Sequence, residues 1–529
     1  MNKFSRVRWI LALMLGLVWA LAYPEPRWSV LAWLVPCCLL ALVSGTNGRC
    51  LFGLAFLIAL IFRLVSLRFL LNIPHSAGAY SGWLALSLFS ALFPAIWVFV
   101  CGSCFRSGLS KEHWPWYKRF RFGLFAAVFW VGTEILQAHV LGGYPWNFLG
   151  VTQFENIPLI QIASITGVYG ISFLIVWFSV SLFFAALQIR RKNQANPWIW
   201  ASDMILPCMV IMITIAFGFF RIGTISELST PIKFALVQPS IPQQLIWATG
   251  SDEKRLAKVL ELSELALLSK PDVLIWPESS APITREKWPK VEQMLQAANV
   301  PLILGLDDAE KDPDSEEFNY YNSAAFVPVG NETPVIYRKR RLVMFGEYIP
   351  FEDIFPFMKY LSPIGSSFSA GKTPVQFPVK DKELTMAPII CFEDSFPHGV
   401  REHVSSTTGL LVNLTNDGWF GEGSAQWQHA ANAVFRSVEN GVPMVRSCNN
   451  GLSCWIDSFG QVRRYFGEES GDIYGAGFVL FEIPLKQSGN MTFYNRYGDV
   501  FGWFCLGLSL VVLLMSFSKR RLHMVGEIS

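Results

Sequence analysis

The sequence predicts a polytopic α-helical membrane domain joined to an α/β domain. Hydrophobic spans follow one another up to about residue 221, and one further span returns at 498–517. Each is long enough to cross about 30 Å of hydrocarbon. Between them, residues 222–497 alternate between strand and helix patterns. We therefore expect a transmembrane domain of about seven helices at 1–221, a second domain at 222–497, and a final helix with a short basic tail at 498–529.

The composition supports a membrane protein. Hydrophobic residues make up 52% of the 529 residues and charged residues 16%, whereas a soluble globular chain is about one quarter charged. The formal net charge is +3, which is too small to indicate a nucleic-acid-binding protein. The expected partners are therefore membrane lipids and not nucleic acid.

The basic residues indicate how the chain crosses the membrane. Eight spans are expected, at 9–23, 28–44, 51–71, 82–105, 121–140, 159–188, 200–220 and 498–517. Lysine and arginine gather before the first span, in every second loop and after the last span, at 3–8, 49, 106–121, 190–192 and 519–521. The positive-inside rule makes that side cytoplasmic, so the domain at 222–497 faces outward. Arg63 and Arg68, near the outer end of the third span, do not fit this pattern.

The first span has an alternative interpretation. Basic residues, an apolar run and Ala20-Leu21-Ala22 also describe a cleaved signal peptide. Cleavage would leave seven mature spans and the same topology, because a signal peptide also enters with its N-terminus inside.

The outward domain contains the patterns of an α/β sheet. Short apolar runs predict strands at 233–237, 273–276, 302–304, 386–390, 410–414, 443–448, 452–456 and 474–484. Leucines and other apolar residues at helical spacing predict helices at 252–268, 286–298 and 426–439. Helices between buried strands indicate a mainly α/β architecture.

Three polar side chains in this domain suit covalent acyl chemistry. Glu278 comes just past one predicted strand, Cys391 ends another, and Lys339 lies in a basic run. Ligands of open α/β sheets bind beyond the carboxyl ends of strands, so these groups could meet at one edge. Each also has a purely structural interpretation: Glu278 as a turn residue, Lys339 as part of a solvated basic face, and Cys391 as a core residue.

The cysteines and histidines indicate neither a disulfide framework nor a metal site. The outward domain has three cysteines, Cys391, Cys448 and Cys454, and an odd number leaves at least one free thiol. Cys448 and Cys454 could pair. His398 and His403 are spaced for neither a helix face nor a strand face, and no metal or nucleotide motif is present. No metal and no cofactor are therefore expected.

Several motifs in order along nearly the whole chain resemble one family. They are 237–243 (VQPSIPQ), 275–279 (IWPES), 337–339 (YRK), 342–350 (LVMFGEYIP), 390–393 (ICFE), 416–421 (NDGWFG), Gln428-His429, Arg436, Glu439, Arg446, Asn449 and Gly451, with Gly143-Tyr144-Pro145-Trp146 in the membrane part. The chain resembles the apolipoprotein N-acyltransferases, the membrane-bound branch of the carbon–nitrogen hydrolase (nitrilase) superfamily.

The resemblance implies an αββα sandwich and a division of roles. Glu278 is implied to be the general base, Lys339 the oxyanion stabiliser and Cys391 the nucleophile, with supporting roles for Glu347, Glu393, Asn322 and Trp247. The implied reaction moves a fatty acyl chain from a phospholipid, through a Cys391 thioester, to the N-terminal amine of diacylglyceryl apolipoproteins. The implied protein is a monomer in the bacterial inner membrane, with its catalytic domain on the periplasmic side.

Two other functions and several departures stay open. A membrane-anchored amidase or nitrilase would pass the acyl group to water, and a transporter or scaffold would carry a degenerate domain. The chain has Met344 where the family usually has proline, Phe392 where it has tyrosine, and Gln137 near the intramembrane Glu134 where a basic residue is expected. An intramembrane carboxylate is a functional candidate by default.

The segment 345–372 combines glycines with a heavy load of aromatic side chains. It is expected to form a lid at the membrane surface that admits lipid substrates. The alternative is that its aromatic residues pack on the core.

Overall fold

The structure, a computed structural model, falls into two compact units. The helical unit comprises 1–67, 84–223 and 497–529, and the sandwich unit comprises 68–83 and 224–496. The residues described are 3–44, 46, 48–109, 114–190, 198–223, 231–248, 250–279, 288–311, 317–330, 332–350, 352, 354–362, 364, 367–485 and 491–526. Within these, the side chains of 3–6, 106–109, 247, 361 and 516–526 are not described.

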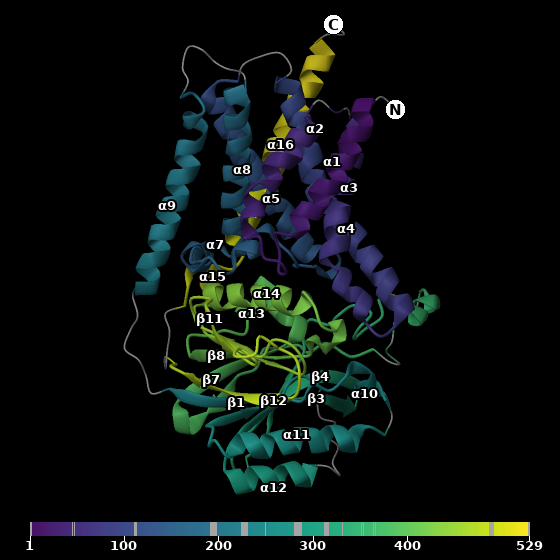
Figure 1. Cartoon of the computed structure of the whole chain (residues 1–529), viewed down its shortest axis with the longest axis vertical. Helices are drawn as coiled ribbons and strands as arrows, with labels where there is room; N and C mark the ends of the chain where they lie inside the picture. Colours follow the sequence, from purple (N-terminus) through teal and green to yellow (C-terminus); the bar gives the residue numbers. More distant parts are fainter. Residues whose placement is uncertain are drawn as a thin grey trace. The chain divides into compact units, whose positions relative to one another are not determined.

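The helical unit is built from long apolar helices (Figure 1). They are α1 (Lys3–Ala20), α3 (Gly48–Ser66), α4 (Ser76–Leu109, whose first residues belong to the sandwich unit), α5 (Trp116–His139), α8 (Val168–Arg190), α9 (Ala201–Gly223) and α16 (Val500–Gly526). Shorter helices are α2 (Val35–Val43), α6 (Ile157–Ile160) and α7 (Ala163–Thr166). Short 3₁₀ turns complete it: η1 (Ser29–Trp33), η3 (Val140–Gly142) and η4 (Leu149–Gln153). Helix α5 packs against α8 and α16, and α1 packs against α3.

Five helices are long and apolar enough to cross a membrane: Gly48–Ser66, Ser76–Phe105, Trp116–Gly142, Val168–Arg190 and Ala201–Gly223. They correspond to five of the eight expected spans. Two more expected spans coincide with the shorter apolar helices Val7–Ala20 and Val500–Met515 in the described part. The expected span 28–44 differs, because it divides into η1 and the nine-residue α2. Pro36 lies in the first turn of α2, where proline is tolerated because that N–H has no helical partner.

The helical unit contains a buried arginine that the loop pattern did not explain. Arg63 of α3 is 3% exposed. Its guanidinium donates to the Trp146 carbonyl oxygen at 3.1 Å and to Gln137 Oε1 at 3.2 Å. Arg63 therefore supplies, from α3, the positive charge that was expected at position 137. Arg63, Gln137 and Glu134 line one small cavity within the helical unit. Glu134 accepts hydrogen bonds from Trp130 Nε1 and the Leu149 amide.

The sandwich unit contains two six-stranded sheets. The first has the order β12-β1-β2-β3-β4-β5 and the second the order β11-β10-β9-β8-β7-β6. The strands are β1 (Ile232–Gln238), β2 (Val273–Ile275), β3 (Leu302–Lys311), β4 (Phe318–Val327), β5 (Val335–Arg338), β6 (Phe377–Val379), β7 (Leu384–Ile390), β8 (Thr408–Thr415), β9 (Met444–Cys448), β10 (Cys454–Ile456), β11 (Val462–Tyr465) and β12 (Gly477–Ile483).

Helices cover the outer faces of the two sheets (Figure 1). Helices α11 (Asp252–Leu267) and α12 (Trp288–Ala298) lie over the first sheet, and α13 (Pro397–Arg401) and α14 (Ala425–Asn440) lie over the second. The remaining short elements are η2 (Arg68–Asn72), α10 (Gln243–Trp247), η5 (Pro356–Leu361), η6 (Lys380–Lys382), η7 (Cys391–Ser395), η8 (Asp417–Phe420) and α15 (Phe493–Tyr497). The architecture is the αββα sandwich that the resemblance implied.

Strand periodicity explains the two cores of the sandwich. On β1, Phe234 and Leu236 join the cluster between the sheets, which includes Met386 and Leu410. Ala235 and Val237 point the other way and join the cluster beneath α11 and α12. Side chains alternate with period two along a strand, so a strand buried on both faces must be apolar throughout.

Candidate active site

Glu278 follows β2, where the chain leaves the first sheet. Trp276 before it is fully buried, and its indole Nε1 donates to Ser263 Oγ of α11 at 2.8 Å. Neighbouring β3 passes very close, since a Cβ at Gly305 would lie 2.6 Å from the Glu278 Cα. Only glycine permits this approach, so Gly305 and Trp276 together hold the Glu278 backbone in place.

Lys339 follows β5 and is only 1% exposed, so it is not part of a solvated basic face. Its Nζ lies 2.7 Å from Glu347 Oε1 and 3.4 Å from Glu278 Oε1. The Asn322 amide, from β4, donates to the same two oxygens at 2.6 Å and 2.8 Å. An ammonium, an amide and two carboxylates thus meet in one buried cluster.

Cys391 follows β7 and adopts a left-handed backbone conformation, with φ of 52°. Such a conformation is uncommon for residues other than glycine. Its thiol interacts with the Glu278 carboxyl, and the positive charge of Lys339 acts to lower the pKa of the thiol. The nucleophile candidate, from the second sheet, therefore joins a cluster whose other members come from the first sheet.

The electrostatics of the cluster follow from burial and its few charges. Burial raises the pKa of Glu278, and the Lys339 ammonium only partly opposes this. Burial lowers the pKa of Lys339, but Glu347 and Glu278 outweigh burial and the net pKa is raised. The pKa of Cys391 is raised by burial and by Glu278, against the opposing effect of Lys339. The resting site therefore holds a charged Lys339 and a protonated thiol.

Glu393 ties the segment of Lys339 to the segment of Cys391. Its Oε1 accepts hydrogen bonds from the Arg340 and Arg341 amides at 2.8 Å and 3.1 Å. Its Oε2 accepts from the Ile390 amide at 2.8 Å, and the Tyr337 hydroxyl lies 2.8 Å from both oxygens. One side chain thereby fixes the ends of β5 and β7 next to each other.

The other residues singled out from the sequence have different positions. Trp247 ends α10, and its side chain lies outside the described residues. Met344 is exposed, and the Phe392 ring lies edge-on to Phe396, with 5.2 Å between the ring centroids. Cys448 and Cys454 are buried free thiols, so the pairing considered above is not formed.

A buried charge cluster beneath Cys391 was not predicted from the sequence. It consists of Asp394, Asp417, His429 and Arg446. Three of these residues fall within the matched motifs, but a motif does not show which of its members contact one another. The only available signal was the occurrence of charged residues in otherwise apolar strands and helices.

The predicted lid segment divides into an anchored part and an exposed part. The Phe368 amide donates to the Glu347 carbonyl oxygen at 2.7 Å, and the Gly371 amide donates to the Lys339 carbonyl oxygen at 2.8 Å. Phe355, Phe357 and Tyr360 are 46%, 58% and 81% exposed. These three aromatic side chains therefore do not pack on the core, whereas Phe351 and Gly365 lie outside the described residues.

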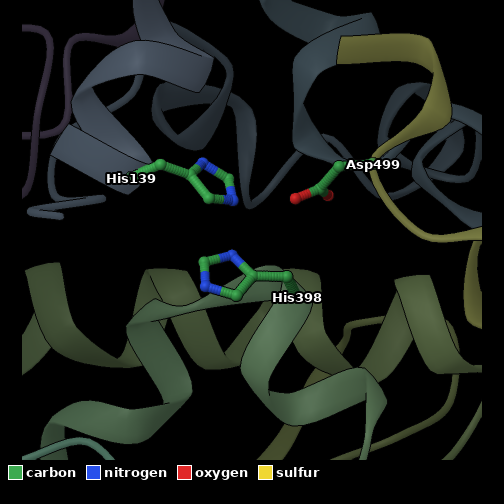
Figure 2. A group of neighbouring side chains, drawn as sticks. All are labelled: His139, His398 and Asp499. Atoms are coloured by element: carbon green, nitrogen blue, oxygen red, sulfur yellow. The ribbon is translucent and has the colours of Figure 1, made fainter. Parts of the chain in front are cut away.

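Three further titratable side chains, His139, His398 and Asp499, are drawn in Figure 2. His139 and Asp499 belong to the helical unit, whereas His398 on α13 belongs to the sandwich unit. We assign no metal to these residues.

Comparisons with known proteins identify both parts of the chain. Residues 15–181 match the family model "Apolipoprotein N-acyltransferase N-terminal domain", and residues 233–476 match "Carbon-nitrogen hydrolase". A solved structure of an amidase from Nesterenkonia sp. is similar with a TM-score of 0.35 and 15% identity, covering 50% of this chain and 93% of that one.

Curated relatives cover nearly the full length. The apolipoprotein N-acyltransferase of Geobacter metallireducens is 32% identical over 99% of this chain and 98% of its own. That of Rickettsia prowazekii is 31% identical over 79% of each chain, and apolipoprotein N-acyltransferase 1 of Treponema denticola is 28% identical over 88% of this chain and 92% of its own. The chain is a member of the apolipoprotein N-acyltransferase family.

Proposed function

We propose that this membrane protein moves a fatty acyl chain from a phospholipid to the N-terminal α-amine of the S-diacylglyceryl cysteine of apolipoproteins. One observation carries the proposal: Glu278, Lys339 and Cys391 leave three different strands, and the half-buried Cys391 meets the buried Glu278 and Lys339. A base, a cation and a thiol in contact are what a thioester mechanism requires. Membership of the family supplies the substrate classes.

The first half-reaction forms a thioester and releases a lysophospholipid. The Cys391 sulfur attacks the ester carbonyl carbon while Glu278 takes the thiol proton. These two events coincide, because the raised pKa of Cys391 leaves little thiolate beforehand. Lys339 stabilises the oxyanion, a contribution of about 3–4 kcal/mol for one such donor. The C–O bond then breaks, and the leaving alcohol oxygen takes the proton from Glu278.

The second half-reaction consumes the thioester. The amine attacks the thioester carbonyl, and Glu278 accepts a proton from the amine nitrogen. When the C–S bond breaks, the sulfur takes that proton and the thiol is restored. The acceptor must be neutral, which an α-amine with a pKa near 8 achieves more readily than a lysine near 10.4.

Glu347 and Asn322 keep the cluster in working geometry. Glu347 holds the Lys339 ammonium at 2.7 Å, and Asn322 bridges the two carboxylates. Glu347 also accepts a hydrogen bond from the Val343 amide at 2.8 Å, which fixes its own carboxylate. Lys339 is therefore presented to the carbonyl oxygen of the substrate without reorganisation at the moment of reaction.

The exposed aromatic residues of the lid segment are proposed to contact lipid. Phe355, Phe357 and Tyr360 leave a large apolar surface that water solvates poorly. The sandwich unit is proposed to face the periplasm of a bacterial inner membrane, as the distribution of basic loops indicates. Crosslinking of 355–360 to the rest of the sandwich unit is expected to stop turnover, and undiminished turnover after efficient crosslinking would contradict gating.

Intact-mass analysis of the purified protein with phospholipid tests the first half-reaction. Wild-type protein is expected to gain one acyl chain that hydroxylamine removes, and Cys391→Ala to gain none. An acyl group on Cys448 or Cys454 in place of Cys391 would contradict the assignment.

The second half-reaction separates the transferase from the hydrolase. The isolated acyl-enzyme is expected to persist in buffer for much longer than one turnover. It is expected to discharge rapidly onto a diacylglyceryl-cysteine peptide with a free N-terminus, and not onto the N-acetylated peptide. Free fatty acid released without an acceptor, as fast as the thioester forms, would instead identify a hydrolase.

A further inference from the structure

The buried charge cluster beneath Cys391 is not used by the proposed chemistry. His429 lies on α14, Asp394 on η7, Asp417 on η8 and Arg446 on β9. All four side chains are at most 2% exposed. Removing four ionisable groups from water costs free energy unless each is paired. The pairing of these four side chains therefore indicates what they contribute to the site.

Both ring nitrogens of His429 face groups that can only accept hydrogen bonds. Nδ1 lies 2.7 Å from Asp417 Oδ1, and Nε2 lies 3.3 Å from the Cys391 carbonyl oxygen and 2.8 Å from Asp394 Oδ1. A carbonyl oxygen never donates, and an ionised carboxylate only accepts. The ring therefore carries a proton on each nitrogen and is an imidazolium.

The charged groups around His429 favour the imidazolium form. They are Asp394, Asp417 and Arg446, from three different elements. Burial lowers the pKa of His429, but the two aspartates outweigh burial and Arg446, and the pKa is raised to about 9. Burial raises the pKa of Asp417, yet His429 and Arg446 outweigh it, so the net pKa is lowered. Arg446 also pairs with both aspartates, so two cations balance two anions.

The carbonyl group that His429 contacts belongs to the nucleophile itself. The Asn413 amide, from β8, donates to the same oxygen at 3.3 Å and to Asp394 Oδ2 at 2.7 Å. Cys391 has a φ of 52°, a strained conformation for a residue other than glycine, which persists only when its surroundings hold it. Two donors on the carbonyl oxygen provide such a hold.

We infer that His429 is a positioning residue for acyl transfer: its charged ring, held between Asp394 and Asp417, fixes the Cys391 main chain so that the thiol faces Glu278 and Lys339. The inference rests on the proposed function, because it assigns a reason for the strained conformation of the nucleophile. His429 contacts Cys391 at the main-chain carbonyl oxygen, which lies 3.3 Å from Nε2. Its effect reaches the reaction through the carbonyl group of Cys391.

The sign of the pH dependence follows from the raised pKa. A histidine with a folded-state pKa near 9 stabilises the fold fully below its ordinary value of 6.5, and this contribution disappears as the pH rises through about 9. Above that pH the ring loses one N–H and its positive charge, so Arg446 is the one cation left to balance Asp394 and Asp417 in this cluster. The rate of Cys391 acylation is therefore expected to fall as the pH rises through about 9.

Two substitutions of His429 separate positioning from mere stability. In His429→Gln the amide nitrogen can take the place of Nε2 and still donate to the Cys391 carbonyl oxygen. In His429→Asn the shorter amide reaches only the position of Nδ1, next to Asp417. Full-length protein in detergent is mixed with phospholipid between pH 6 and 10, and the initial rate of thioester formation is measured per folded molecule by intact mass. Alkylation of Cys391 by iodoacetamide is measured in parallel.

His429→Gln is expected to lose the decline near pH 9, because it has no titrating ring. His429→Asn is expected to form the thioester about tenfold more slowly than His429→Gln at pH 7, the effect of one hydrogen bond of ordinary net strength. The control is His403→Gln, which removes another buried histidine. Burial lowers the pKa of His403 to about 4, so this residue does not titrate in the range and the variant is expected to keep the wild-type decline.

Three results would overturn the inference. They are a decline near pH 9 that persists in His429→Gln, equal rates per folded molecule for both variants and wild type, and a wild-type alkylation profile that follows a single titration of the Cys391 thiol with no second inflection near pH 9. The last is measurable even if neither variant folds. Failure of wild-type Cys391 to gain an acyl chain would instead contradict the proposed function, while the alkylation measurements would still decide the role of His429.

Discussion

Replacing Glu393 by glutamine tests whether this one side chain holds the segment of Lys339 and the segment of Cys391 together, a role called the clamp below. The carboxylate accepts the Arg340 and Arg341 amides on one oxygen and the Ile390 amide on the other. A glutamine amide must present its NH₂ group to one of these two sides. In either orientation at least one main-chain N–H loses its acceptor and faces another donor.

The magnitude follows from that count. One buried N–H left without a partner lowers the free energy of unfolding by about 1–3 kcal/mol. In a domain of this size each kcal/mol lowers the melting temperature by roughly 2 °C. The effect on rate is larger. A misplacement of about 1 Å between reacting groups costs about 10²-fold, and the clamp sets the separation of Lys339 and Cys391. We expect Glu393→Gln to lower the rate of thioester formation by about that factor.

Glu402 provides a matched control, because it contacts Arg340, one of the residues whose main chain Glu393 binds. Glu402 pairs with the Arg340 side chain at 2.6 Å but is 46% exposed, and such exposed pairs contribute about 0–1 kcal/mol. Melting is followed by intrinsic fluorescence, and acylation by intact mass. Glu402→Gln is expected to match wild type in both. If Glu393→Gln also matched wild type in both, Glu393 would not be a clamp.

Three shorter predictions concern the cation, the base and the buried arginine. Lys339→Met is expected to slow thioester formation by about 10²–10³-fold, because it removes a preorganised oxyanion donor. The control Lys380→Met, at an exposed ion pair with Glu332, is expected to leave the rate unchanged, and equal rates for the two variants would show that Lys339 takes no part in the reaction. Because burial raises the pKa of Glu278, the rate is expected to fall with decreasing pH at values above the ordinary 4.5 for glutamate. The folded state binds this proton more tightly than the unfolded state, so Glu278 itself opposes acid unfolding, and a rate loss that coincides with unfolding would contradict the assignment. Arg63→Gln is expected to lower the melting temperature, since the Trp146 carbonyl oxygen loses a charged donor, and the exchange Arg63→Gln with Gln137→Arg is expected to restore part of it; no recovery in the exchange would show that the position of the charge matters more than its presence.

The local sequence pattern was sufficient to predict an element where apolar residues predominate along its whole length. The strands that contain Leu236, Ile275 and Ile390 are short apolar runs, and the five candidate membrane helices have a high mean hydropathy, so both kinds of element follow from local pattern. Strands β4, β5, β6 and β11 were not predicted. In β4 the first half carries polar residues such as Asn319 and Asn322, which interrupt the apolar run. The expected span 28–44 takes a different form, a 3₁₀ turn followed by a short helix, because hydropathy does not register the change of helix type before Pro36.

The sequence by itself determined that the chain is a membrane protein of the apolipoprotein N-acyltransferase family, because motif order and hydropathy are properties of the linear chain. It also singled out Glu278, Lys339 and Cys391 as candidates. Only the tertiary structure decided that Lys339 is buried between two carboxylates, that Glu393 holds Arg340 and Ile390 together, and that Arg63 stands in for the expected charge at Gln137. The same holds for His429, which lies 38 residues from Cys391 in sequence and 3.3 Å from its carbonyl oxygen in space. Such pairings depend on which strand ends share an edge and which helix covers them, and residue spacing along the chain contains no information about either.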